Sequence, residues 1–132
     1  MRDALERFRR GWEALDLEAV LSTVARRDDV VVYGTDFPER WVGYRALVEP
    51  FRAQMRAFGA PRYRWREGDP RIWVASEAAW ACGELSVSVD AGTGRVSVDL
   101  RSTFVLAREA GGWKIVHAHF SVGQAVPVVA YS

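Results

Sequence analysis

The chain has 132 residues, of which 49% are hydrophobic and 27% charged, and its formal net charge is +1. This length and composition predict one globular domain spanning residues 1–132, with enough apolar side chains for a single core. The near balance of charge argues against a protein that binds nucleic acid or an anionic membrane. The single cysteine, Cys82, excludes an internal disulfide and a cysteine-rich zinc site.

The first residues of the chain carry charges where a secretory signal would have an apolar core. Arg2, Asp3 and Glu6 interrupt the start of the sequence. No apolar run approaches the ~20 residues that a helix needs to span a bilayer. We therefore expect a cytoplasmic protein without a membrane partner.

Two short amphipathic helices, or one bent helix, are predicted at the start of the chain. Leu5 and Phe8 begin an apolar stripe with spacings of three and four, which predicts a helix over residues 3–15. Asp16 is suited to cap a second helix, and a second apolar stripe continues to about Arg27. Polar residues fill the opposite faces, so one side of these helices should pack on the core.

A short strand, a loop and a third helix are expected next. The β-branched run at residues 30–33 is typical of a strand that is covered on both faces. Residues 34–40 form a loop because Pro38 bars regular structure there. A helix follows at about residues 44–58, and Pro50 either occupies the first turn of a helix or kinks a longer one.

From Pro61 onward the apolar residues recur with period two. The predicted strands are residues 61–66, 72–75, 78–90, 95–107 and 112–121. Helices gathered on one face of such an antiparallel sheet make an α+β fold. The long strands are apolar on both faces while one layer of helices is available, so we expect a second subunit to cover the other face. The apolar tail, residues 124–132, is expected to lie on a neighbouring surface.

Both histidines of the protein lie in the last predicted strand. His117 and His119 are two residues apart, so their side chains share one face of that strand. They are suited to acid–base chemistry, to binding an anion, or to a structural role with bonds to backbone. A metal site would need about three protein ligands. Asp36 or Glu84 could complete one, but no local spacing supports it, so no metal is expected.

Several segments together carry a resemblance to a known family: Asp28–Tyr33, Gly34-Thr35-Asp36, Glu39–Gly43, Arg101-Ser102-Thr103 and Gly112–Ser121. The chain resembles the SnoaL-like members of the nuclear transport factor 2-like superfamily over essentially its whole length. The resemblance implies a strongly curved, mixed and mostly antiparallel sheet wrapped around N-terminal helices. This sheet forms a cone-like barrel with a pocket at its open end, and a homodimer forms through the outer sheet face.

The resemblance leaves the activity open. The superfamily includes ketosteroid-isomerase-like enzymes, polyketide cyclases, dehydratases and the association domain of a calmodulin-dependent kinase. Motifs of this kind specify a fold well and chemistry poorly.

Arg101 is expected near the histidines. The resemblance favours an inward Arg101 beside His117 and His119, and the register of one hairpin decides whether they share a face. An arginine with two histidines suggests a carboxylate ligand. The alternative is an Arg101 that pairs with Asp99 or Glu84.

Further site residues follow from the family comparison. Asp36 is the loop acid that it places best for proton transfer, and His119 is the other candidate catalytic group. Trp41 either covers the pocket or packs a helix onto the sheet. Tyr33 and Tyr44 are either donors to a ligand oxygen or core residues whose hydroxyl reaches water.

The leading interpretation is a small homodimer with a largely apolar, aromatic-lined pocket. It would bind a small organic molecule, expected to be an acid, without a cofactor. One alternative is a cofactor-free isomerase, cyclase or hydrolyase that uses Asp36 or a histidine for proton transfer. Another is an association domain with a vestigial pocket.

Overall fold

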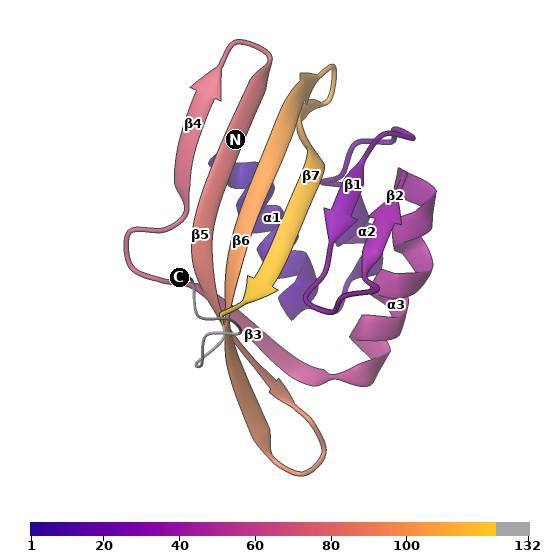
Figure 1. Cartoon of the computed structure of the whole chain (residues 1–132), viewed down its shortest axis with the longest axis vertical. Helices are drawn as coiled ribbons and strands as arrows, with labels where there is room; N and C mark the ends of the chain where they lie inside the picture. Colours follow the sequence, from indigo (N-terminus) through magenta and orange to yellow (C-terminus); the bar gives the residue numbers. More distant parts are fainter. Residues whose placement is uncertain (124–132) are drawn as a thin grey trace, which may run out of the picture.

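The computed structural model describes residues 1–123, so the expected packing of the tail lies outside the described residues. Figure 1 shows the elements in chain order. They are α1 (Arg2–Glu13), α2 (Leu17–Leu21), β1 (Val31–Tyr33), β2 (Arg40–Val42), the 3-10 helix η1 (Tyr44–Leu47), α3 (Val48–Ala57), β3 (Gly59–Trp65), β4 (Arg71–Ala75), β5 (Ala78–Asp90), β6 (Arg95–Glu109) and β7 (Gly112–Val122).

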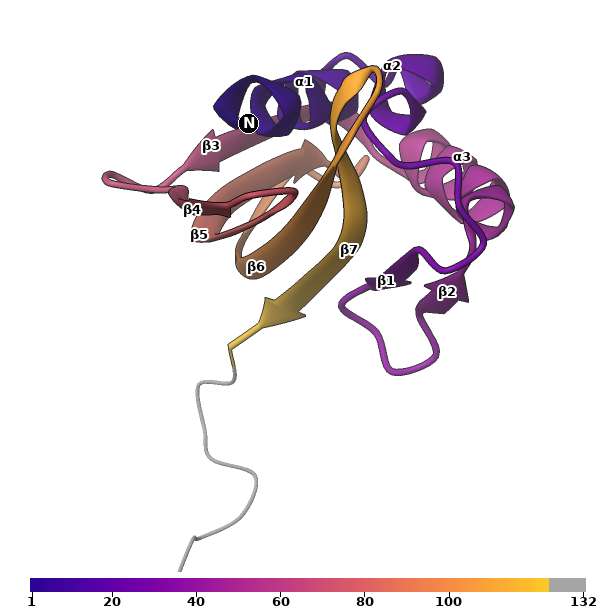
Figure 2. The same ribbon diagram turned by 90° about the horizontal axis from the view of Figure 1, so that it is seen from above.

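The strands form a seven-stranded sheet in the order β2-β1-β7-β6-β5-β3, with β4 paired to the free edge of β5. β1 runs parallel to β7, and the other pairs are antiparallel. The sheet curves beneath α1, with α2 and α3 beside it, and does not close on itself (Figure 2). The predicted α+β fold with a curved, mixed and mostly antiparallel sheet is thus confirmed.

The two N-terminal helices form where the apolar stripes predict them. The Asp16 side chain accepts a hydrogen bond from the backbone amide of Ala19 at 3.0 Å and so caps α2. α2 ends at Leu21, well before the expected end near Arg27. The helices approach closely at Gly11, where an added Cβ would lie 2.7 Å from a methyl carbon of Val20.

The segment before α3 holds a strand that the sequence did not predict. Arg40–Val42 forms β2 and pairs with β1, so that Trp41 lies opposite Val32. A strand of three residues is too short to show a period of two, and the preceding Pro38 favours a loop. The helix that follows starts at Val48 after η1, which places Pro50 in its first turn.

The long strands β5 and β6 alternate between a covered inner face and an outer face. The inner residues that are buried include Ala79, Ala81, Leu85, Val87, Ser102, Phe104 and Leu106. Phe104 has no exposed surface, and its ring lies 5.7 Å from that of Phe8 on α1 and 5.6 Å from that of Phe120 on β7, measured between centroids. The apolar stripe of α1 therefore packs on the inner face of the sheet.

Candidate ligand-binding cavity

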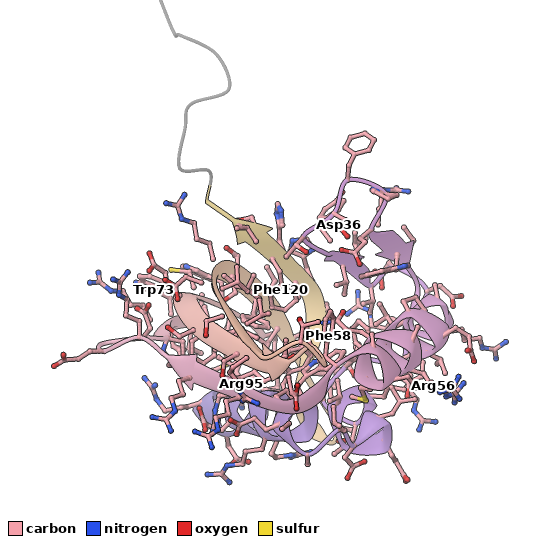
Figure 3. All side chains as sticks on the ribbon, turned by 90° about the horizontal axis from the view of Figure 1, so that it is seen from below. Asp36, Arg56, Phe58, Trp73, Arg95 and Phe120 are labelled. Carbon is pink, nitrogen blue, oxygen red and sulfur yellow. The ribbon has the colours of Figure 1, made fainter. Side chains whose placement is uncertain are left out.

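A cavity of about 530 Å³ opens between α1, α3, the β1–β2 hairpin and the inner face of the sheet. Figure 3 looks toward this end of the molecule, with Asp36 on the hairpin and Phe58 beyond the end of α3. The volume falls in the range of small-molecule sites. Most of the large side chains on its wall are aromatic: Phe8, Trp12, Trp41, Phe51, Phe58, Tyr63, Trp65, Phe104 and Phe120.

The aromatic side chains come from different elements and contact one another. The ring centroids of Trp12 on α1 and Phe51 on α3 lie 5.0 Å apart, with the planes at 63°. Trp41 on β2 meets Phe51 edge to face at 6.2 Å. Tyr63 on β3 lies 6.4 Å from Trp12. Edge-to-face contacts of this kind fix ring orientation, so the wall of the cavity is held in place by its own packing.

Arg9 lines the cavity and links α1 to β3. Its guanidinium donates to Glu13 Oε1 at 2.7 Å, to Glu6 Oε2 at 2.9 Å, and to the backbone oxygen of Tyr63 at 2.9 Å. Glu13 Oε2 accepts from the Tyr63 amide, and Glu6 Oε1 accepts from the Trp65 indole, each at 3.0 Å. The hydrogen bond from Arg9 is the main cause that lowers the pKa of Glu6 below its ordinary value. Both carboxylates are therefore engaged by structural partners.

Tyr63 supplies a neutral polar group on the cavity wall. Burial is the main cause that raises its pKa to about 12, and the charge of Glu13 adds to the effect. The phenol therefore stays protonated at neutral pH, and its hydroxyl can donate a hydrogen bond to a ligand.

The β1–β2 hairpin brings two carboxylates to the rim of the cavity. Glu39 Oε1 accepts a hydrogen bond from the Asp36 amide at 2.8 Å, and the Glu39 backbone oxygen accepts from the Gly34 amide at 2.9 Å. Gly34 leaves room for the Glu39 side chain, because a Cβ at that position would lie 2.6 Å from Glu39 Oε1. Asp36 is exposed and Glu39 half-buried, and both line the cavity.

Asp36 and Trp41 are the predicted site residues that the structure places on the cavity wall. Trp41 is half-buried and faces inward opposite Val32, and its ring meets that of Phe51 edge to face. Trp41 therefore packs α3 against β2, and it also borders the cavity.

The register of the β6–β7 hairpin places Arg101 on the same face as the histidines. Arg101 pairs with Ser121, and Thr103 pairs with His119. Phe120, which lies between these two β7 residues, points the other way and lines the cavity. Arg101 and the histidines thus share the outer face of the sheet, and their expected convergence on the pocket does not occur.

A bulge in the last hairpin explains why the histidines face outward. Strict alternation along β7 would give Ile115 and His117 the same face. The register shifts between the pairs Leu106–Ile115 and Val105–His117, so Val116 is an extra residue. Ile115 is buried on the inner face as a result, and the histidines point away from it.

The remaining predicted donors also lie outside the cavity wall. Tyr33 is exposed on the outer face, where its ring centroid lies 5.9 Å from that of His117 and 5.3 Å from that of His119. His117 Nδ1 lies 2.8 Å from the backbone oxygen of Val31, which suits a structural bond. Tyr44 packs under the guanidinium of Arg26, 5.5 Å from the ring centroid.

Sequence reasoning missed several cavity residues. Tyr63 and Trp65 were placed correctly on one face of a strand, but nothing in the sequence showed which face the helices cover. Arg9 and Glu39 gave no signal, because a charged residue on a helix or loop usually faces water. Within residues 1–123, no group of three or more His, Cys, Asp or Glu side chains is arranged to share a metal ion. None of the helices in this range has the length and the apolar run that a bilayer crossing requires.

An open, curved sheet around N-terminal helices, with an aromatic cavity between them, defines a cone-shaped α+β domain with a pocket. The model of the SnoaL-like domain family matches residues 1–125, and the chain belongs to that family. No curated protein sequence matches it.

Several solved structures share the fold of this chain. A nuclear transport factor 2-like superfamily protein from Salmonella enterica serovar Typhimurium is 18% identical, with a TM-score of 0.83 over 98% of this chain and 93% of that chain. A protein from Streptomyces avermitilis, named as a candidate dehydratase of the NTF2-like family, is 19% identical, with a TM-score of 0.82 over 92% of each chain. A candidate calcium/calmodulin-dependent protein kinase type II association domain from Thiobacillus denitrificans is 23% identical, with a TM-score of 0.75 over 92% of this chain and 93% of that chain. At these identities the likeness shows the fold alone.

Proposed function

We propose that this chain, acting as one domain, binds a small and largely apolar organic molecule in the cavity. The observation that carries the proposal is a cavity of about 530 Å³ whose wall is mostly aromatic and is built by four different parts of the fold. Burial of a ligand against such a wall supplies the favourable free energy, and the Tyr63 hydroxyl supplies a point of orientation.

The charges on the wall do not favour the organic acid that the sequence suggested. That expectation depended on Arg101 and the histidines, which lie on the outer face. Among the described residues that line the cavity, Arg9 is the only basic one, and Glu6 and Glu13 already bind its guanidinium. A carboxylate ligand would lack a free cation, so we propose a ligand that is not an anion.

Binding of Nile red tests this function, because it is a neutral dye whose emission rises in apolar surroundings. Ala53 is exposed on α3 and lines the cavity. Ala53→Trp should therefore fill the opening and lower the affinity for the dye by at least about tenfold. Ala46→Trp makes the same change at an exposed site in η1 that does not line the cavity, and it should bind as the unchanged protein does. Equal affinities for all three proteins would contradict the proposal.

A second candidate function is a cofactor-free isomerase, cyclase or hydrolyase. The observation in its favour is that a carboxylate, Asp36, and a protonated phenol, Tyr63, line the same cavity. A base with a neutral hydrogen-bond donor is the minimum set for removing a proton next to a carbonyl. His119 lies outside the cavity, so Asp36 is the base in this proposal.

Proton exchange tests the second function without knowledge of the substrate. The protein should accelerate deuterium exchange at the acidic carbons of 2-tetralone, followed by nuclear magnetic resonance in D₂O. Asp36→Asn should lower that acceleration by about 10²-fold while Nile red binding persists. Exchange at the same rate in both proteins would assign this chain to binding alone.

We also propose that a second copy of the chain covers the outer sheet face. Trp73 and Trp80 stack on one another there at 6.1 Å, and each remains 44% exposed. Cross-strand pairing extends the row through Val105, His117 and Val31 to Val42 at the other edge, so that His117 is the one polar member of an otherwise apolar row. Such an apolar row suits a dimer interface, for which about 800 Å² per partner is typical. The similar structures named as association domains support the same proposal.

A further inference from the structure

We infer that the cavity selects an apolar cation, a substituted ammonium with an aromatic or aliphatic body, over neutral and anionic molecules of the same shape. This inference rests on the proposed function and adds the charge of the ligand to it. Two independent features carry it, namely the faces of the aromatic wall and the sign of the charges around that wall.

The aromatic wall provides the first feature. Trp12, Phe51, Trp41 and Tyr63 form one connected group: the ring centroid of Trp12 lies 5.0 Å from that of Phe51 and 6.4 Å from that of Tyr63, and Phe51 lies 6.2 Å from Trp41. The face of each ring carries negative quadrupolar charge, and a cation within about 6 Å of a ring centroid is attracted to it. Tryptophan is the strongest such partner, and two of these four residues are tryptophans. An ammonium group in the cavity would therefore lie close to several rings, and each ring that turns its face to the group would attract it.

The charges at the rim provide the second feature. Asp36 and Glu39 line the cavity, and within residues 1–123 neither takes part in an ion pair. Arg9 also lines the cavity, and its one positive charge is paired with the two negative charges of Glu6 and Glu13, which do not line it, so this group leaves one negative charge. The groups on and behind the wall thus sum to a negative charge, which repels an anion and attracts a cation.

The basic residues near the opening do not cancel this charge. Arg40 lies on the outer face of β2, because its neighbour Trp41 takes the inward position. On α3, Arg52 is bound to Glu49, and Figure 3 shows Arg56 on the side of the helix away from the opening. The acidic rim therefore faces the cavity without a basic partner among the residues that line it.

Three probes of matched shape separate charge from size. They are benzyltrimethylammonium, its neutral carbon isostere neopentylbenzene, and the anion phenylmethanesulfonate, whose sulfonate is also tetrahedral. Each is titrated against bound Nile red at low ionic strength. The ammonium should bind a few-fold more tightly than the neutral isostere, and the sulfonate at least about tenfold more weakly than the ammonium. Sulfonate or neopentylbenzene binding at least as tightly as the ammonium overturns the inference.

Paired variants locate the charge. Asp36→Asn with Glu39→Gln keeps the shape of both side chains and removes the two rim charges. This change should lower the affinity for benzyltrimethylammonium about five- to tenfold and leave the affinity for neopentylbenzene within about twofold of its original value. Glu67→Gln with Glu77→Gln removes two exposed carboxylates that do not line the cavity. This control should leave the affinity for both probes unchanged. Circular dichroism and retained Nile red binding establish that both double variants fold. An equal loss of ammonium affinity in the two double variants, or no loss at the rim, overturns the inference.

The outcomes also separate this inference from the proposed function. If Nile red and neopentylbenzene enter the cavity while benzyltrimethylammonium does not, the charge preference is wrong and ligand binding stands. If neither the dye nor any of the three probes binds, both proposals are wrong. In each case the result concerns the same cavity, because Ala53→Trp blocks whatever binds there.

Discussion

Arg101 on β6 pairs directly with Ser121 on β7, and Phe120, the residue before Ser121, points to the opposite face of the sheet. The thickness of the sheet therefore separates the Arg101 side chain from the aromatic cavity. His119 pairs with Thr103 and lies on the same side as Arg101. The outer face holds Arg101 and both histidines, whereas the cavity is lined by aromatic rings, by the carboxylates of Asp36 and Glu39, and by the paired Arg9.

This separation predicts that Arg101→Ala leaves Nile red affinity within about twofold, because the guanidinium does not reach the cavity. Phe120→Ala serves as the comparison, since its ring lines the cavity and its loss removes apolar contact area. Fluorescence titration of both variants measures the effect. A loss of tenfold or more in Arg101→Ala would show that the outer face communicates with the bound ligand.

The proposed dimer predicts a mass near twice 14.8 kDa in sedimentation at micromolar concentration. Trp80→Glu places a charge in the apolar row of the outer face and should shift the protein to the monomer. Val96→Glu introduces the same charge at a valine that is 50% exposed on the other face of its strand, and it should remain dimeric. If the unchanged protein sediments as a monomer, the proposal that a second copy covers the outer sheet face is wrong.

The Glu6–Arg9 pair predicts a pH-dependent contribution to stability. The pKa of Glu6 is lowered mainly by the hydrogen bond from Arg9. A carboxyl whose pKa is lower in the folded state stabilises the fold above its unfolded pKa, here 4.5, and loses that contribution as pH falls through the folded value. Glu6→Gln should therefore lower the free energy of unfolding by about 1 kcal/mol at pH 7, with a difference that shrinks below pH 4.5.

Urea unfolding at a series of pH values from 7 downward measures this difference. Glu77→Gln is the control, because Glu77 is exposed and takes part in no ion pair among the described residues. A destabilisation of Glu6→Gln that stays constant with pH would indicate lost packing instead of a lost charge interaction.

Replacing Gly34 by alanine should disturb the rim of the cavity through a steric clash. A Cβ there would lie 2.6 Å from Glu39 Oε1 and 2.8 Å from Glu39 Cβ, so Gly34→Ala must displace the Glu39 side chain from the Asp36 amide. Loss of that hydrogen bond should lower the free energy of unfolding by about 1 kcal/mol in a thermal or urea melt. Gly111→Ala is the matched control, because its Cβ would meet nothing nearer than 3.8 Å. Equal stabilities of the two variants would contradict this account of the hairpin.

The period of the apolar residues predicted the helices and long strands well, because α1 and β5 each bury one regular face. Pro50 lies in the first turn of α3, which is one of the two positions that the sequence allowed; the other was a kink inside a longer helix. The facing of the last strand could not be predicted, because one extra residue at Val116 reverses it and leaves no mark in the composition. β6 carries apolar residues at both alternating positions, with Val105 on the outer face, so its pattern did not reveal the covered side either.

The candidate site could also be predicted only in part, because the sequence does not show which face of each strand is covered. Asp36 and Trp41 were named from the family resemblance, and both line the cavity. Trp41 faces inward because it pairs with Val32 in β2, a strand that the sequence did not predict. Arg9 joins the cavity through contacts with Glu13 and β3, and such contacts between distant segments have no periodic signature.

Trp41 offers the most direct test of the cavity as a binding site. Its indole borders the cavity and packs edge to face on Phe51 at 6.2 Å, so Trp41→Leu removes ring area from the wall while keeping an apolar side chain. Nile red affinity should fall by about three- to tenfold, equivalent to roughly 1 kcal/mol. Trp113→Leu is the matched control, because Trp113 is half-buried under Arg108, 4.9 Å from its ring centroid, and does not line the cavity. Urea melts of both variants separate lost stability from lost affinity. If the two variants bind the dye equally well, Trp41 packs the hairpin onto α3 and makes no contact with the ligand.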